Sequence, residues 1–391
     1  MVTNLPREAL HKWREVALAK RPEEKIRKLQ EFLSLVPKHK GTESLRNHSK
    51  RKIASLKEEI VDKKRKKTGV GRSSFFVEKE GDTQIVILGF TNVGRSSIIS
   101  ILTNAKIEIS SYPYTTKEPT PGMFQYQDLQ FQLVEAPALI ENAADGGTSA
   151  LKTLTVARNA DALLLIVDLS KDPVKQYSLI SKELEKSRIL TRKPKGKVEI
   201  ERIYKGAGLK IIIVGRLLNS NFKEIEELLK SYGIYDAMVK IQGEATADDV
   251  EDAIFEGTVY RPTILIANKT DYPNATQKIE QLKKFIGDEI KILPTSCKTK
   301  NGLEKLGSEI FGILDIIRIY TKEPNKRSPS KKPFTTKVDS TILDLAKKIH
   351  SDFYKQFSYA KIWAKRLRFS PQKVGGNFIL EDGDIVELHM R

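Results

Sequence analysis

The 391-residue chain contains few of the residues that stabilise secreted or metal-binding proteins. Its one cysteine, Cys297, has no partner within the chain for a disulfide, and its five histidines show no spacing typical of metal ligands. No apolar run approaches the roughly 20 residues needed to span a bilayer. The N-terminal sequence MVTNLPREALHKWREVALAK also lacks the apolar core of a secretory signal. We therefore expect a cytoplasmic protein from a reducing compartment.

Positive charge is abundant and unevenly distributed. The net charge is +18. Residues 1–72 contain 21 Lys and Arg against 9 Asp and Glu, and residues 322–333 contain 5 against 1. Basic segments attached to a nearly neutral body favour a polyanionic partner, most simply RNA or the ribosome. The alternative is that the lysine-rich segments are ordinary solvated helices.

Apolar periodicity divides the chain into four parts. Residues 1–72 form a basic arm whose pattern predicts two helices joined near residues 37–42 as an antiparallel hairpin. Residues 73–321 alternate apolar strands with helices, which is typical of a parallel sheet covered on both faces. Residues 322–333 form a basic linker. Residues 334–391 predict a small β-grasp-like domain, for which binding is the expected role.

Three features inside these parts are more specific predictions. Two apolar strands at 161–168 and 262–267 are separated by far more residues than a crossover needs, so we interpret about 189–258 as an inserted α+β subdomain. A final helix is predicted over Leu303–Ile317. In the last domain we expect a helix over Thr341–His350 with Ser340 as its N-cap, and strands at Trp363–Leu367 and Asp384–Leu388.

An apolar strand ending at Gly89 is followed by residues typical of a phosphate-binding loop. The sequence from Gly89 to Ser96 matches G-x-x-x-x-G-K-[ST], except that Arg95 stands where lysine is expected. In such a loop, backbone N–H groups and the following helix N-terminus bind phosphates. Arginine keeps the positive charge, but its planar guanidinium is wide and does not replace an ammonium group equivalently.

Two later segments predict recognition of guanine. Asn268-Lys269-Thr270-Asp271 follows an apolar strand, where the carboxylate of Asp271 would accept the N1 and N2 protons of guanine and reject adenine, which lacks that pair of donors. Asn268 and Lys269 would brace the neighbouring loops. The backbone of Ser296, Cys297 and Lys298 would meet the guanine carbonyl. The interpretation of the chain as an ATPase predicts a preference for adenine and therefore conflicts with Asp271.

This set of motifs resembles the translation-factor-like GTPases, and within them the Obg/DRG group. Residues 112–116 (YPYTT) with Pro121-Gly122 resemble the switch I region of that group. Residues 259–262, 355–363, 371–375 and 380–384 resemble the developmentally regulated GTP-binding (DRG) proteins. The resemblance covers nearly the whole chain. It implies an α/β fold: a P-loop GTPase domain with an inserted α+β subdomain, an N-terminal helical hairpin and a C-terminal β-grasp (TGS) domain.

The same resemblance implies function and site residues. It implies binding of GTP with Mg²⁺, slow hydrolysis, and association with ribosomes or translating RNA. The residues that would bind the phosphates are Gly89, Asn92, Val93, Gly94, Arg95, Ser96 and Ser97. Ser96 and Thr116 (or its neighbour Thr115) would be Mg²⁺ ligands, and Glu135 would hold Mg²⁺ through a water. Asn92 matches the asparagine with which related GTPases hold K⁺.

Departures from the family pattern gather at the γ-phosphate. The switch II motif D-x-P-G is replaced by Glu135-Ala136-Pro137-Ala138, and Ala138 lacks the freedom of glycine to turn its peptide. Leu139 follows, where Ras-like enzymes place glutamine; an apolar residue there is what the resembled group shows, so another group must orient the attacking water. The three departures Arg95, Glu135 and Ala138 predict guanine-nucleotide binding with impaired hydrolysis. The alternative is a pseudo-GTPase that does not cycle and acts as a constitutive RNA- or ribosome-binding adaptor.

Aromatic residues are interleaved with basic ones in the last domain. Stacking on RNA bases is one interpretation, and packing in the core of a small domain is the other. The residues concerned are Tyr354, Phe357, Tyr359 and Trp363, among Lys355, Lys361, Lys365 and Arg366.

Overall fold

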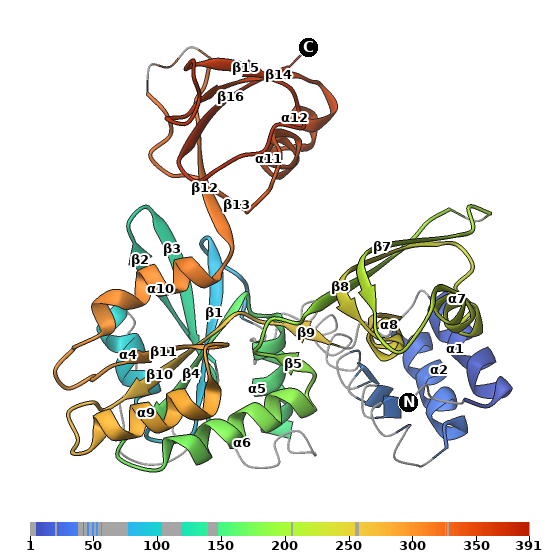
Figure 1. Cartoon of the computed structure of the whole chain (residues 1–391), viewed down its shortest axis with the longest axis horizontal. Helices are drawn as coiled ribbons and strands as arrows, with labels where there is room; N and C mark the ends of the chain where they lie inside the picture. Colours follow the sequence, from blue (N-terminus) through green and yellow to red (C-terminus); the bar gives the residue numbers. More distant parts are fainter. Residues whose placement is uncertain are drawn as a thin grey trace, which may run out of the picture. The chain divides into compact units, whose positions relative to one another are not determined.

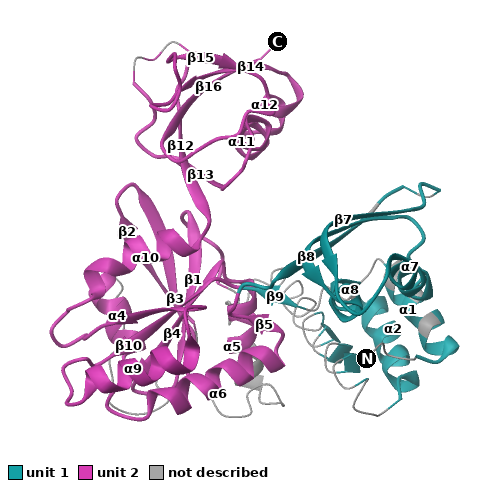
Figure 2. Ribbon diagram, in the orientation of Figure 1, with its two compact units in different colours: residues 1–74, 193–260 teal, residues 75–192, 261–391 magenta. Residues whose placement is uncertain are grey.

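The computed structural model describes most of the chain. The described residues are 5–19, 22–37, 42, 45–46, 49–50, 52–53, 56, 77–103, 119–139, 148–204, 206–254, 258–324, 326 and 328–390. They form two compact units, one from residues 1–74 and 193–260 and one from residues 75–192 and 261–391 (Figure 2). The segment predicted as an insertion therefore belongs mostly to the same unit as the N-terminal arm.

The second unit contains a six-stranded sheet in the order β11-β10-β4-β1-β3-β2 (Figure 1). Five strands are parallel, and β2 pairs antiparallel to β3. The strands are β1 Thr83–Gly89, β2 Thr120–Tyr126, β3 Leu129–Glu135, β4 Ala162–Asp168, β10 Thr263–Asn268 and β11 Lys291–Pro294. Every residue of β1, β4 and β10 is buried, as predicted for strands covered on both faces.

Helices cover both faces of this sheet. On one face, α4 (Arg95–Leu102), η3 (Leu303–Lys305) and α10 (Leu306–Ile313) pack on a core that includes Ile87, Leu164 and Ile266. The other helices of this unit are α5 Thr148–Asn159, α6 Pro173–Lys186 and α9 Ala275–Ile286, and it also contains the short strand β5 Ile189–Leu190. The short strand β9 Val259–Tyr260 belongs to the first unit. The loops that follow β1, β4, β10 and β11 consequently leave from one edge of the sheet, which is where ligands bind in open α/β folds.

The helix predicted over Leu303–Ile317 is wrong only at its C-terminal end, after Ile313. α10 ends at Ile313, and Ile316–Thr321 forms β12, which pairs with strands of the second sheet of this unit. Burial in β12 alternates, with Ile317 and Ile319 facing the core. The run is rich in β-branched residues, which favour a strand. Because its apolar residues closely follow those of α10, the sequence pattern did not show where the helical period changes to the alternation of a strand.

The second sheet confirms the predicted β-grasp domain. Its order is β13-β12-β16-β14-β15, with β12 and β16 parallel. The elements are β13 Phe334–Lys337, α11 Ile342–Ile349, α12 Ser351–Lys355, β14 Phe357–Trp363, β15 Gln372–Val374 and β16 Asp384–Met390. The strand predicted at Trp363–Leu367 is wrong because β14 ends at Trp363. The predicted cap is one residue early: Thr341, not Ser340, forms a capping box with Asp344.

The turn between β2 and β3 contacts β12 through polar groups. The guanidinium of Arg318 donates to Gln127 Oε1 (2.6 Å) and Asp128 Oδ1 (3.3 Å) and pairs with Asp382 Oδ2 (2.7 Å). The hydroxyl of Tyr320 also donates to Asp128. Burial, with the adjacent Asp128 carboxylate, raises the pKa of Tyr320 to about 12. These contacts tie the start of the β-grasp sheet to the first sheet.

The first unit combines the arm with a three-stranded sheet in the order β6-β8-β7. Its elements are α1 Arg7–Leu18, α2 Pro22–Leu35, β6 Gly196–Arg202, β7 Leu209–Leu217, α7 Phe222–Ser231, β8 Ala237–Ala245 and α8 Ala247–Ile254. Leu29 and Phe32 of the arm share one hydrophobic core with Ile225 and Val239. The arm and the inserted segment therefore bury apolar surface against each other.

Parts of the sequence prediction for this unit fall outside the described residues. The second helix of the predicted hairpin is described only at scattered positions, and the basic run at 63–67 is not described. Strand β6 was not predicted, although Val198 and Ile200 alternate with charged residues. Among the described helices, none has both the length and the hydrophobicity needed to cross a membrane.

Candidate functional site

The phosphate-binding loop predicted from sequence joins β1 to α4. Gly94 has φ +103° and Asn92 has φ +62°, both in the left-handed region. A Cβ at Gly94 would overlap the Nδ2 of Asn268, and a Cβ at Gly89 would lie 2.8 Å from the carbonyl oxygen of Ile166. Glycine is therefore required at both positions. The first N–H groups of α4 have no acceptor within the helix, which suits them to an anion.

Asn268 connects the phosphate loop to the loop after β11. Its side chain is 1% exposed. Nδ2 donates to the carbonyl of Val93 (2.8 Å), and Oδ1 accepts from the backbone N–H of Cys297 (3.2 Å) and from Thr295 Oγ1 (3.4 Å). An asparagine satisfies this geometry because it carries both a donor and an acceptor. The bracing role predicted for Asn268 agrees with these contacts.

Lys269 is held by a carboxylate at the end of β4. Its backbone has φ +71°, and its Nζ lies 2.6 Å from Asp168 Oδ2. Asp168 is 1% exposed and also accepts from the N–H and the hydroxyl of Ser170. Burial acts to raise the pKa of Asp168, but Lys269 and Ser170 outweigh it and the net shift is downward. The ion pair therefore fixes the backbone that leads to Asp271.

Asp271 is exposed at the surface and oriented by Ser296. The hydroxyl of Ser296 donates to Asp271 Oδ1 (2.6 Å), and this hydrogen bond is the main cause that lowers the pKa of Asp271. Ser296 itself is fully buried. An ionised carboxylate is an acceptor only. The recognition of guanine by Asp271 stays a prediction.

The Ser296–Lys298 backbone is partly used within the protein. The N–H of Ser296 donates to the carbonyl of Asn301 (3.1 Å), and the N–H of Cys297 donates to Asn268. Burial raises the pKa of the Cys297 thiol, which keeps it neutral. Lys298 is exposed. The contact of this backbone with a guanine carbonyl stays a prediction.

Arg95 lies inside the protein, between the start of α4 and the end of β3. It is 7% exposed. Nη1 donates to the carbonyl of Ala136, and Nη2 lies 3.9 Å from Glu135 Oε1. Burial lowers the pKa of Arg95, and Glu135 opposes that shift. The sequence predicted a phosphate-binding role for Arg95, but its guanidinium is engaged with Glu135 and Ala136.

The structure brings together Ser96, a predicted Mg²⁺ ligand, and Glu135, which was predicted to hold Mg²⁺ through a water. Ser96 Oγ donates to Glu135 Oε1 (2.7 Å), and Glu135 is fully buried. A hydroxyl that donates its hydrogen keeps its lone pairs, and hydroxyl and carboxylate oxygens are the donors that Mg²⁺ prefers. This donor set fits a hard divalent cation, which would neutralise phosphate charge when bound. Thr115 and Thr116 lie outside the described residues.

Two residues that hold the site together were not assigned by sequence reasoning. Asp168 was recognised only as the acidic end of an apolar strand. Gln176 bonds its backbone from both sides, accepting from the N–H of Asp168 (3.0 Å) and donating to its carbonyl (3.0 Å). The signal available was an acid that ends the strand adjacent to β10. No local pattern marks Gln176.

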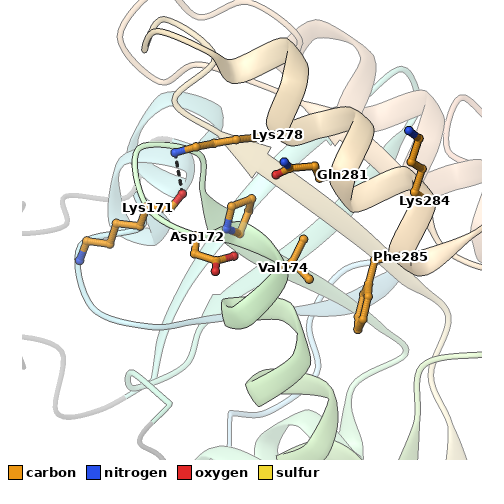
Figure 3. A pocket seen from close by; sticks show the side chains of 8 residues that line it. Lys171, Asp172, Val174, Lys278, Gln281, Lys284 and Phe285 are labelled. Atoms are coloured by element: carbon orange, nitrogen blue, oxygen red, sulfur yellow. Dashed lines mark hydrogen bonds between the residues drawn. The ribbon is translucent and has the colours of Figure 1, made fainter.

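A groove of about 660 Å³ between the start of α6 and α9 contains none of the predicted site residues (Figure 3). Its lining residues are Lys171, Asp172, Pro173, Val174, Lys278, Gln281, Lys284 and Phe285. The Nζ of Lys278 donates to the carbonyls of Leu169 (2.7 Å) and Lys171 (2.8 Å). The groove thus borders the turn after Asp168.

Models of protein families match most of the chain. A family described as "50S ribosome-binding GTPase" matches residues 84–199, and the "C-terminal region of MMR_HSR1 domain" matches residues 206–316. A "TGS domain" matches residues 317–390. The last match begins within β12, in agreement with the strand that replaces the end of the predicted helix.

Similar proteins align over almost their whole length. An uncharacterized GTP-binding protein of Methanocaldococcus jannaschii is 30% identical over 384 residues, covering 97% of this chain and 95% of the relative. Developmentally-regulated G-protein 3 of Arabidopsis thaliana is 30% identical over 367 residues, covering 93% and 98%. The crystal structure of a GTP binding protein from Pyrococcus horikoshii OT3 is 17% identical, with a TM-score of 0.42 over 79% of this chain and 100% of that one.

Proposed function

The chain belongs to the family of developmentally regulated GTP-binding (DRG) proteins, and on that premise we propose that it binds guanine nucleotides but hydrolyses GTP poorly. The observation that carries the first half is the side chain of Asn268. Its hydrogen bonds join Val93 of the phosphate loop to Cys297 of the loop after β11. The neighbouring Ser296 donates to the ionised carboxylate of Asp271, which would bind the base. One buried residue thus couples the two halves of a nucleotide site.

Support for the second half lies at the end of β3. In this family the phosphate-loop cation and the switch II acid are a lysine and an aspartate, but Arg95 and Glu135 occupy these positions here. The guanidinium of Arg95 is engaged with the carbonyl of Ala136 instead of being available to phosphate oxygens. Leu139, where Ras-like enzymes place glutamine, is not one of these departures, because an apolar residue at this position is typical of the family. Mg²⁺ would be held by Ser96 and Glu135, and K⁺ by Asn92.

Calorimetry and a turnover assay test this proposal. We expect GDP and a non-hydrolysable GTP analogue to bind in the presence of Mg²⁺. Their affinities are measured once in a buffer with K⁺ and once in a buffer with Na⁺. We expect GTP turnover at least about tenfold slower than in the variant R95K/E135D/A138G, which restores the family residues. Brisk turnover by the parent that is lost in N268A would contradict impaired hydrolysis. The absence of binding to either nucleotide would instead favour the constitutive adaptor.

Association with RNA or the ribosome is the second part of the proposed function. The matched family is described as ribosome-binding. On the β-grasp sheet, Tyr359 stacks on His389 (4.3 Å between ring centroids) and Lys373 lies 4.0 Å over Tyr359. Trp363 is covered by Lys322 at 4.5 Å. Phe357 instead packs against the core of the β-grasp domain, so its role is structural and not the stacking on RNA bases proposed for the other aromatic residues.

The salt dependence of RNA binding measures this contribution. In fluorescence anisotropy with a labelled 30-nucleotide RNA, we expect K331A/K332A, in the exposed linker, to weaken binding and to reduce the slope of log K against log[salt] by about 1 to 2. The matched control is K283A/K284A, two exposed lysines of α9. Equal slopes in all three proteins would show that the linker lysines do not contact phosphates.

A further inference from the structure

Arg95 and Glu135 form a buried ion pair that the family pattern does not contain. Arg95 begins α4 and Glu135 ends β3, and their charged groups approach to 3.9 Å (Nη2 to Oε1). The pair is almost completely shielded from water, with side-chain exposures of 8% and 0%. Ser96 Oγ donates to the same carboxylate oxygen at 2.7 Å. Because water does not reach these groups, each charge is stabilised mainly by the other one.

The two departures from the family pattern compensate each other's charge. Arginine and glutamate are both longer than the lysine and aspartate that they replace, and their charged groups lie 3.9 Å apart. A buried guanidinium without a counter-charge is strongly unfavourable, and so is a buried carboxylate. Removing the charge of one residue alone would therefore leave the other charge buried without a partner.

The pair also holds the backbone of the switch II segment. The other terminal nitrogen of the Arg95 guanidinium, Nη1, donates to the carbonyl of Ala136. The N–H of Ala136 donates to Ile87 (3.2 Å), and the N–H of Leu139 donates to Gly89 (3.1 Å). Ala136, Ala138 and Leu139 are all buried. These contacts hold segment 135–139 at both ends.

We infer that Arg95 is a positioning residue for segment 135–139, and that Arg95 and Glu135 act as one coupled pair that opposes its movement. A γ-phosphate can favour one conformation of this segment only by its differential affinity for the two conformations. Hydrogen bonds that already hold the segment reduce that difference. The expected consequence is that the protein binds GTP and GDP with similar affinity, and this consequence rests on the proposed function. The coupling itself does not require a nucleotide.

A double-mutant cycle tests the coupling without nucleotide. Thermal unfolding is measured for the parent, R95M, E135Q and R95M/E135Q, in which one or both charges are removed. We expect each single variant to lower Tm by roughly 5–10 °C and the double variant to return to within about 2 °C of the parent. A parallel cycle on the exposed pair Lys326–Glu323 (2.7 Å) should change Tm by less than about 1 °C. Additive losses at Arg95 and Glu135 would overturn the inference.

Calorimetry then measures the functional consequence. The ratio of the GDP Kd to the Kd of the non-hydrolysable GTP analogue should rise about tenfold in R95K/E135D, which restores the family residues, relative to the parent. An unchanged ratio would overturn the positioning role. If the parent binds neither nucleotide, the proposed function fails while the unfolding cycle still decides the coupling. Single variants that do not fold, beside an R95M/E135Q that does, would support the coupling, whereas a Tm of E135Q equal to the parent's would count against the pair.

Discussion

Replacing Asp271 with alanine is expected to reduce the affinity for GDP by roughly 10²- to 10⁴-fold. The estimate follows from two hydrogen bonds to a charged acceptor at about 1.5–3 kcal/mol each. Because Asp271 is exposed and contacts Ser296 by a single bond, we expect Tm to change by less than about 2 °C. Calorimetry with GDP, together with thermal unfolding, separates a binding defect from a folding defect.

The matched variant is D271N, which keeps the size of the side chain and exchanges one acceptor for a donor. It should lose affinity for GDP and gain affinity for xanthosine diphosphate, whose ring carries a carbonyl where guanine carries the amino group. GDP affinity equal to the parent's in D271A would place the base elsewhere and remove the main argument for guanine recognition.

Replacing Asn268 with aspartate is expected to destabilise the second unit and abolish measurable nucleotide binding. The side chain keeps its shape, but the donor that faces the carbonyl of Val93 becomes an acceptor, and a charge is placed in a site that is 1% exposed. A buried charge without a partner costs about 3–5 kcal/mol. That is a fall in Tm of roughly 10 °C for a domain of this size. Thermal unfolding and GDP calorimetry measure the two effects.

Asn274 offers the matched control for this substitution. It is exposed, has φ +62°, and precedes α9. Aspartate tolerates the left-handed region nearly as well as asparagine, so N274D should change the free energy of unfolding by less than about 0.5 kcal/mol. A comparable loss of stability in both variants would mean that the Asn268 hydrogen bonds contribute nothing specific.

The loops of the candidate site were predictable because each follows a strand with a strong local signal. Gly89 and Gly94 are required by backbone geometry, and residues 268–271 come directly after an apolar run. Parallel topology then brings the ends of β1, β4, β10 and β11 to one edge without any further information from side chains. For this reason the pattern predicted which loops meet, and the hydrogen bonds of Asn268 agree with it.

The sequence could not predict features that depend on distant partners. The direction of Arg95 is decided by Glu135 and the carbonyl of Ala136, some forty positions away, and a motif comparison places it at the phosphates instead. β12 was missed because its partners in the β-grasp sheet follow it in the chain, while its apolar residues extend those of α10. Local periodicity does not distinguish a strand whose partners are remote from the last turn of a helix.

The shared core of the arm and the inserted segment has a consequence for synthesis on the ribosome. Leu29 and Phe32 leave the exit tunnel long before Ile225 and Val239 against which they pack. At about 5–20 residues per second, the intervening chain of about 190 residues takes roughly 10–40 s to make. During that interval the apolar faces of α1 and α2 lack their native cover, and the intervening strands of the second unit emerge meanwhile. The first helices to be made therefore reach their final packing only after about half of the chain has followed them.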